Sequence, residues 1–208
     1  MAISFLASDL GKWDQLEPSA APEALVLPFF GDERPLRGAA GLCDWRLCGR
    51  LSRLLSSGRV GGGFGETTLY PPGKRLPFAR LLLVGLGAAE RFDERVANEA
   101  ARLIAGKMRG LGLPRYALVP PGRSTGRLSA RRALEIFLAA FNAGSDEPAA
   151  ADPAGPADPV GPPSPASPAR SPADLVIVES VAGQKEAADL ARTHVNRYAT
   201  ESLTSPSK

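Results

Sequence analysis

The stretch that decides the fold runs from Arg80 to Met108 and reads RLLLVGLGAAERFDERVANEAARLIAGKM. It begins with an apolar run, Arg80–Val84, which is bounded by turn residues and is typical of a strand covered on both faces. A glycine turn follows. An amphipathic helix then begins after Asp93, whose carboxylate can cap the first turn. The stretch therefore predicts a strand, a tight turn and a helix that packs back against a sheet.

The glycine turn of this stretch is close to a dinucleotide-binding fingerprint, but two chemical requirements are missing. Gly85–Glu90, GLGAAE, places Glu90 where a third glycine should allow close packing, and its carboxylate would repel a pyrophosphate. The next predicted strand, Tyr116–Val119, runs into Pro120-Pro121-Gly122 and offers no acid for a ribose. We therefore predict a structural turn and no nucleotide cofactor.

Strands and helices alternate on both sides of this stretch. Pro28 lies inside one predicted strand and favours an edge position or a bulge for it. The alternation predicts an α/β fold with a mixed central sheet and helices on both faces. The further predicted strands are Ala2–Ala7, Ala24–Phe30 and Thr67–Tyr70, and the further predicted helices are Gly38–Gly58 and a helix from Ser129 to Gly144.

A second glycine-rich segment, Gly61–Gly65, resembles a phosphate-binding loop. In nucleotide triphosphatases such a loop ends in Gly-Lys-Ser/Thr before a helix. Here it continues into Glu66-Thr67-Thr68 and a predicted strand, with a carboxylate in place of the lysine. We therefore do not expect nucleotide hydrolysis.

Proline, alanine, serine and aspartate dominate residues 145–172, which divide the chain into three parts. Such a segment has too little apolar surface to offset the entropy of ordering it, so we predict a disordered linker. The predicted α/β domain is 1–144. Residues 173–208 should return as a strand at Asp174–Glu179 and a C-terminal helix.

Composition and cysteine spacing exclude several classes of protein. The 208 residues are 44% hydrophobic and contain no apolar run long enough to span a bilayer, and the N-terminus is a poor signal peptide, so we expect a cytoplasmic protein without a membrane partner. Cys43 and Cys48 are five residues apart on one predicted helix, which disfavours a disulfide and predicts buried thiols. With one histidine in the chain, we predict no metal site.

The positive charge is concentrated in the first 144 residues, which contain 20 Lys and Arg against 13 Asp and Glu. A basic domain of this kind can bind polyanions, or can simply be well solvated. Cations at a helix start oppose the helix dipole, and a ligand phosphate would relieve this. The candidate polyanion contacts are Arg46, Arg50 and Arg53 on one helix, and Arg123, Arg127, Arg131 and Arg132 around the start of another.

Residues 24–73, ALVLPFFGDERPLRGAAGLCDWRLCGRLSRLLSSGRVGGGFGETTLYPPG, together with ARLLLVGLG at 79–87, resemble the N-terminal domain of the leucyl aminopeptidases, the M17 metallopeptidases. The tail, EAADLARTHVNRYATESLTSPSK, is similar to the segment that joins the two domains of that family. The resemblance implies a macro-domain-like three-layer sandwich that helps to organise a hexamer. In some bacterial members this domain also contributes to DNA binding.

The resemblance also implies that catalysis takes place elsewhere. The family's two divalent metals lie in a C-terminal domain, and this chain stops where that domain would start, so we carry over no catalytic, cofactor or metal residue. We expect a non-catalytic, stand-alone relative that acts as an interaction, regulatory or oligomerisation module, with a protein partner or with itself. The alternatives are a module that binds a polyanion or nucleotide-like ligand, nucleic acid included, and an accessory part of a two-chain metallo-aminopeptidase.

Overall fold

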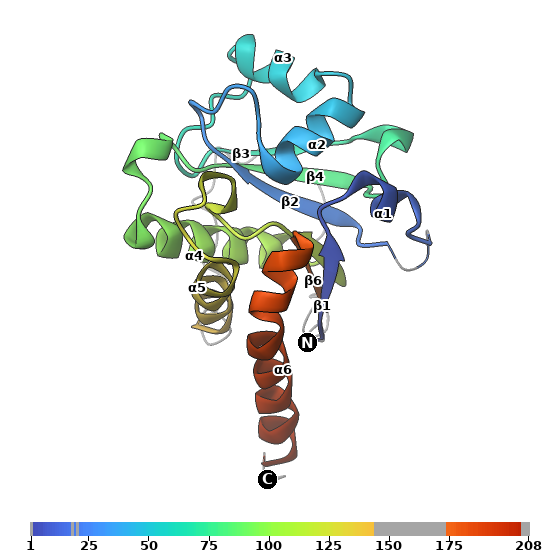
Figure 1. Ribbon diagram of the computed structural model, residues 1–208, viewed down its shortest axis with the longest axis vertical. Coiled ribbons are helices and arrows are strands. Elements are labelled where there is room, and N and C mark those ends of the chain that lie inside the picture. The colour runs from blue at the N-terminus through green and yellow to red at the C-terminus, as the bar shows by residue number, and fades with distance from the viewer. Residues whose placement is uncertain (1, 18, 20, 144–173, 205–208) are drawn as a thin grey trace, which may run out of the picture.

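The computed structural model describes residues 2–17, 19, 21–143 and 174–204 (Figure 1). The predicted linker, 145–172, lies outside the described residues. The strands are β1 (Ile3–Ala7), β2 (Ala24–Phe29), β3 (Thr67–Tyr70), β4 (Arg80–Gly85), β5 (Arg115–Leu118) and β6 (Asp174–Glu179). The helices are α1 (Leu10–Asp14), α2 (Gly38–Arg46), α3 (Arg50–Ser56), α4 (Glu94–Leu111), α5 (Ala130–Ala143) and α6 (Val181–Thr204), with short 3-10 turns η1 (Gly73–Arg75), η2 (Ala89–Arg91) and η3 (Arg123–Thr125).

The six strands form one mixed sheet in the order β1-β6-β5-β2-β4-β3. Neighbouring strands are parallel except for β3, which pairs antiparallel with β4 at the edge. The C-terminal strand β6 lies inside the sheet, where it pairs with β1 on one side and with β5 on the other. The first strand is therefore joined to the rest of the sheet through the last one.

Both faces of the sheet are covered by helices, as the alternation of strands and helices predicts. Ala24 and Val26 of β2 belong to the core beneath α4, α5 and α6, whereas Leu25 and Leu27 belong to the core beneath α1, α2 and α3. Successive residues of a strand point to opposite faces, so a continuous apolar run supplies both cores. The result is a three-layer sandwich, which confirms the predicted fold class (Figure 1).

Helix α4 begins after the predicted cap residue, Asp93, but it runs past Gly110, where we expected it to end. The carboxylate of Asp93 accepts a hydrogen bond from the amide of Val96 at 2.8 Å, which satisfies one of the free donors of the first turn. Gly112 ends the helix in the left-handed conformation, with φ of 57°. Between these caps the buried positions Ala97, Ala101, Ile104 and Met108 recur at helical spacing.

The prediction of one helix over Gly38–Gly58 is wrong, because the chain forms two helices there. The backbone turns at Cys48 and Gly49, which have φ angles of 55° and 74°. The carboxylate of Asp44 then caps the second helix by accepting the amides of Leu51 and Ser52 at 2.8 and 3.1 Å. Leucine spacing predicted a single helix because buried leucines continue through the break.

Candidate functional site

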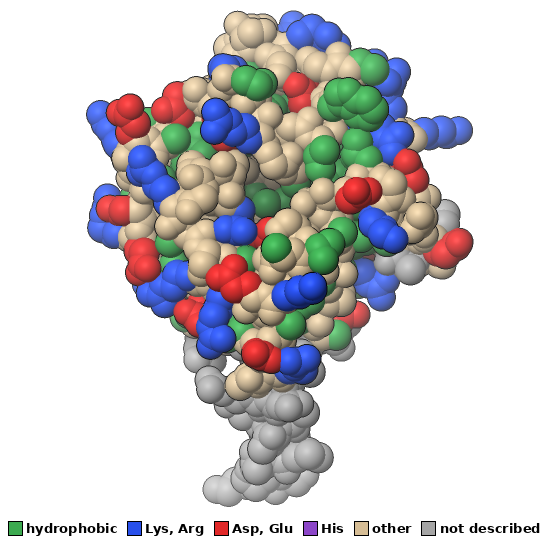
Figure 2. All heavy atoms as spheres, in the orientation of Figure 1, with side chains coloured by type: hydrophobic (Ala, Val, Ile, Leu, Met, Phe, Trp, Pro, Cys, Tyr) green, Lys and Arg blue, Asp and Glu red, His purple; other side chains and the backbone are tan. Residues whose placement is uncertain are grey.

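A cleft lies at the carboxyl ends of the parallel strands β1, β6, β5 and β2, and its volume is about 260 Å³. Figure 2 shows a hollow near the centre of this face, with basic and acidic side chains around it. Its walls come from the ends of these strands, the start of α2 and the loop that carries η3. The residues that line it include Pro28, Arg37, Gly38, Arg123, Ser124 and Glu179.

Pro28 helps to explain why the sheet opens at this point. Pro28 led us to expect an edge position or a late bulge for its strand, and the edge position is wrong, because β2 is an inner strand between β5 and β4. The pairing of β2 with β5 ends where the amide of Val119 donates to the carbonyl of Val26. The backbone of residue 28, two positions later, points to the same side, where β5 has already ended. Pro28 has no amide hydrogen to donate, but no strand pairs with it on this side, so the sheet loses no hydrogen bond. An inner strand can therefore contain this proline.

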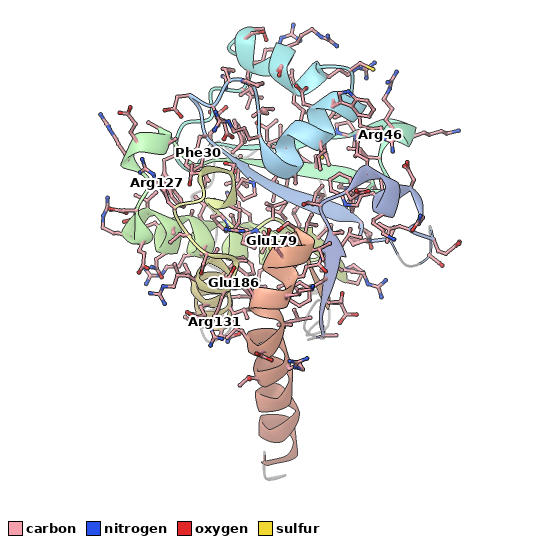
Figure 3. The ribbon with its side chains drawn as sticks, in the orientation of Figure 1. Phe30, Arg46, Arg127, Arg131, Glu179 and Glu186 are labelled. Atoms are coloured by element: carbon pink, nitrogen blue, oxygen red, sulfur yellow. The ribbon has the colours of Figure 1, made fainter. Side chains whose placement is uncertain are left out.

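A charged pair is built into the floor of the cleft. Arg123 Nε donates to Glu179 Oε2 at 2.5 Å and its Nη2 donates to Oε1 at 3.3 Å. Only 7% of Glu179 is exposed, and the amide of Ser180 donates to the same carboxylate at 2.8 Å. Figure 3 shows Glu179 where β6 meets α6. Arg123, one of the predicted polyanion contacts, is therefore held in a fixed position by an acid that the sequence analysis did not single out.

The start of α2 forms another wall. Its N-cap residue, Arg37, makes no side-chain capping bond. Among the residues that the structure describes, we find no acceptor for the amides of Gly38, Ala39 and Ala40, and the first intrahelical bond runs from the amide of Gly41 to the carbonyl of Arg37. The amides at this helix start therefore remain available in the cleft wall.

The other predicted contacts around the start of α5 are bonded within the protein. Arg127 donates to the carbonyls of Glu90 and Phe92, both at 3.0 Å. Arg131 pairs with Glu135 at 3.0 Å. Arg132 pairs with Glu94 at 2.9 Å, and this hydrogen bond lowers the pKa of the Glu94 carboxyl.

The start of α5 already holds a carboxylate. Glu186 of α6 accepts a hydrogen bond from the amide of Ala130 at 3.2 Å. The Ser129 hydroxyl, then the amides of Ala130 and Arg131 and the charge of Arg123, lower the pKa of Glu186 below the usual glutamate range. In Figure 3 Glu186 lies between α5 and α6. The position at which we expected a ligand phosphate is thus filled from the chain itself.

The arginines of the first predicted cluster do not form one stripe, because α2 and α3 are separate helices. Arg46 forms an ion pair with Asp14 of α1, whereas Arg50 and Arg53 are exposed on α3. Figure 3 shows Arg46 far from Arg127 and Arg131. The two predicted clusters therefore do not combine into one basic surface.

The glycine-rich loop, Gly61–Gly65, is closed by its own acid. The amide of Gly61 donates to the two carboxylate oxygens of Glu66 at 2.9 and 3.1 Å, and the amide of Gly63 donates to Oε2 at 3.2 Å. A Cβ at Gly85 would lie 2.2 Å from the carbonyl oxygen of Gly63, so the loop packs directly on the end of β4. Glu66 occupies the place where a bound phosphate would accept these bonds.

In the glycine turn after β4, as in the glycine-rich loop, a carboxylate of the chain itself accepts a backbone amide. It does not lead straight into a helix, because η2 lies between the turn and α4. The carboxylate of Asp32 accepts the amide of Ala89 at 3.0 and 3.2 Å. This geometry supports the prediction of a structural turn at Gly85–Glu90.

The cysteines differ from the expectation that both thiols are buried. Cys43 is buried, and burial, followed by the nearby charge of Asp44, raises the pKa of its thiol well above the usual range. Cys48 is exposed, because it lies at the break between α2 and α3. Within the described ranges no group of three His, Cys, Asp or Glu side chains could hold a metal ion, and no helix is long and apolar enough to cross a membrane.

Comparison with known proteins identifies relatives in one family. The model of the cytosol aminopeptidase family, N-terminal domain, matches residues 26–145. A probable cytosol aminopeptidase of Synechocystis sp. is 33% identical over 88 residues, which cover 42% of this chain and 18% of the relative. One from Pseudomonas syringae pv. tomato is 29% identical over 97 residues, which cover 47% of this chain and 20% of the relative. The chain thus matches at most about a fifth of the length of these curated relatives.

Solved structures share the fold at low sequence identity. A Trypanosoma brucei macrodomain in complex with ADP-ribose has a TM-score of 0.59 and 13% identity, over 93% of this chain and 68% of that one. The macrodomain of Thermus aquaticus DarG has a TM-score of 0.52 and 14% identity, over 85% and 97%. A tomato leucine aminopeptidase mutant has a TM-score of 0.51 and 15% identity, over 91% and 35%. These likenesses establish a macro-domain-like sandwich. The match of the family model over residues 26–145 shows that the chain belongs to the cytosol aminopeptidase family, through its N-terminal domain.

Proposed function

We propose that this chain acts as a non-catalytic assembly module of the cytosol aminopeptidase type, and that it associates with further copies of itself. The observation that carries the proposal is Trp45, a large apolar side chain on α2 that is 73% exposed. Aromatic residues are enriched in protein interfaces, and tryptophan is among the residues that contribute most to binding. A tryptophan left in water on a well-packed domain is therefore a candidate interface anchor.

The edge of the sheet offers a second feature of the same kind. Strand β3 is an edge strand, and Leu69 at its centre is 50% exposed. An edge strand has unpaired backbone donors and acceptors, which favour contact with another chain. Among the described residues, Phe64 and Val181 are the other large apolar side chains with high exposure.

The arrangement of the arginines supports assembly over polyanion binding. Five of the seven candidate contacts, Arg46, Arg123, Arg127, Arg131 and Arg132, bond to acids or carbonyls of the chain itself. Arginines that are already paired release few counterions when a polyanion approaches, so they add little to such binding. Only Arg50 and Arg53 remain exposed together on one short helix.

Sedimentation velocity of the full chain from low to high micromolar concentration tests the proposal. We expect a species larger than the monomer to grow with concentration. Trp45→Ser should weaken the association by about 30-fold, the effect of losing an interface hot spot of about 2 kcal/mol. Arg53→Gln, another exposed change nearby in sequence, serves as the control and should leave association unchanged. A wild-type chain that stays monomeric throughout the range would refute the proposal.

A further inference from the structure

We propose that Trp45 binds residues 153–170 of a second copy, and that this segment binds as a polyproline II helix. The inference rests on the proposed function, because it names what Trp45 contacts in the assembly. It combines an exposed tryptophan, which lies beside cations that have no acid partner among the described residues, with a proline repeat elsewhere in the chain. Residues 153–170 lie outside the described ranges, and their sequence indicates how they bind.

The segment 153–170 reads PAGPADPVGPPSPASPAR and consists of six consecutive triplets that each begin with proline. A polyproline II helix has three residues per turn, so positions three apart lie along one edge. One edge is therefore proline throughout, and the second contains only alanine, valine and proline. The third edge contains glycine, aspartate, serine and arginine. In this conformation the segment is amphipathic, with two apolar edges and one polar edge.

The Trp45 surface lies where the end of α2 meets η1, and it consists of Leu42, Trp45, Lys74 and Arg75. Arg75 Nη1 donates to the carbonyl of Arg46 at 3.5 Å and to Cys48 Sγ at 2.9 Å, so its guanidinium lies close to the backbone on both sides of Trp45. Leu42 is half-buried one turn before Trp45 on α2. Figure 2 shows hydrophobic side chains bordered by basic ones over the end of α2.

The charges of this surface and of the segment are opposite. Lys74 and Arg75 are exposed, and neither forms an ion pair within the described ranges, whereas Arg46 is paired with Asp14. Residues 145–172 contain four acids and one base, and three of the acids are six residues, or two turns, apart on the edge that continues the polar one. These acids are Asp146, Asp152 and Asp158. Such complementarity favours association and fixes its orientation.

Proline-rich segments bind to aromatic side chains on other proteins, because the polyproline II helix is already extended and loses little entropy on binding. In the proposed contact the proline edge packs on the indole ring of Trp45. The polar edge is the next one around the helix, so Asp152 and Asp158 can approach Lys74 and Arg75. An apolar ring with cations beside it therefore matches both edges of the segment.

The length of the segment favours a second copy over the domain to which it belongs. At about 3.1 Å per residue, 18 residues extend about 56 Å, roughly twice the length of the 18-residue helix α4. Proline-rich segments are semi-rigid, and only residues 171–173 separate the last triplet from β6. A stiff segment that begins so close to the sheet extends past its own domain and can reach another.

Sedimentation velocity of full-length proline variants tests the inference. The in-register variant, which breaks the proline edge but keeps length and charge, combines Pro156→Ala, Pro159→Ala and Pro162→Ala. We expect it to weaken association about tenfold, as loss of an interface contact does. The control variant removes as many prolines, none of them on that edge, and should associate like the wild type; it combines Pro148→Ala, Pro163→Ala and Pro172→Ala.

The charged part of the contact is tested with Lys74→Gln. This change should weaken association about threefold at low salt, the effect of one exposed ion pair, and the difference from the wild type should vanish at high salt. Lys107→Gln, an exposed lysine on α4, is the control and should have no effect. Equal behaviour of the two lysine variants would contradict the proposed orientation of the segment.

A synthetic peptide of residues 150–172 gives an independent measurement. In excess it should dissociate the wild-type assembly and change the tryptophan fluorescence of the chain, and Trp45→Ser should abolish the fluorescence change. A peptide without either effect would contradict the inference.

Failure of this inference and failure of the proposed function give different results. If the wild type stays monomeric, self-association is refuted and the inference fails with it. If the wild type associates and the in-register variant associates equally well, self-association stands and only the inference fails. Trp45 would then contact another part of the second copy, such as β3.

Discussion

Replacing Glu66 with alanine should destabilise the domain and at the same time create an anion site. The carboxylate of Glu66 holds the amides of Gly61 and Gly63 at 2.9–3.2 Å. The loop cannot move to give these amides other partners, because Gly62 already packs against Gly31. A Cβ added at Gly62 would lie 2.6 Å from the Gly31 Cα. Loss of a comparable capping carboxylate costs about 1 kcal/mol, and two amides are involved, so we expect a loss of about 1–2 kcal/mol.

Urea unfolding at neutral pH measures this loss, and thermal unfolding should show a decrease in Tm of about 2–4 °C for each kcal/mol. Glu90→Ala is the control, because its side chain is exposed and makes no hydrogen bond or ion pair within the described residues. Added sulfate should stabilise the Glu66→Ala variant more than the wild type, because the freed amides can bind it. Equal stability of the Glu66→Ala and Glu90→Ala variants, or equal stabilisation of wild type and Glu66→Ala by sulfate, would refute this role of Glu66.

Three further predictions concern the thiols, the acid limb of stability and the C-terminal strand. A maleimide should label Cys48 in the native protein and leave Cys43 unmodified until the chain unfolds, because burial raises the pKa of the Cys43 thiol. Mass spectrometry of tryptic peptides measures the labelling of each cysteine, and equal labelling of the two would contradict the prediction. Because the pKa of Glu186 is lowered in the folded chain, its stabilising contribution is present above the ordinary glutamate pKa of 4.5 and is lost as pH falls through the lower folded value. Glu186→Gln should therefore reduce the loss of stability on acidification, which urea unfolding at several pH values measures. Cleavage at a protease site placed within residues 145–172 should leave two fragments that elute together on native size exclusion, because β6 is hydrogen-bonded between β1 and β5. Separation of the fragments without denaturant would show that this pairing is weak.

The regular part of the fold could be predicted from the sequence because its signals are local. The apolar run of β4 and the Asp93 cap of α4 lie within one continuous stretch, and neither needs information from the rest of the chain. The break between α2 and α3 could not be predicted in this way, because the leucine spacing continues across it. Its cause is a capping bond from Asp44 that competes with the helix.

The cleft could not be predicted because it depends on strand order. The sequence gives no direct sign that β6, which follows residues 144–173, inserts beside β5 and brings Glu179 to Arg123 over a separation of 56 residues. In the same way, Glu186 reaches the start of α5 from the C-terminal helix. Arginines that look free in a sequence can therefore be paired by acids that are far away along the chain.

The accessibility of Trp45 is the most direct test of whether this chain acts as an assembly module. The chain has two tryptophans, of which Trp13 is fully buried and Trp45 is 73% exposed, so acrylamide quenching of the native monomer should report mainly on Trp45. If Trp45 anchors an interface between copies, its quenching should fall as protein concentration rises through the micromolar range, and the exposed fraction should approach that of a buried residue. Quenching of Trp45 that stays constant from dilute to concentrated protein would contradict the central claim.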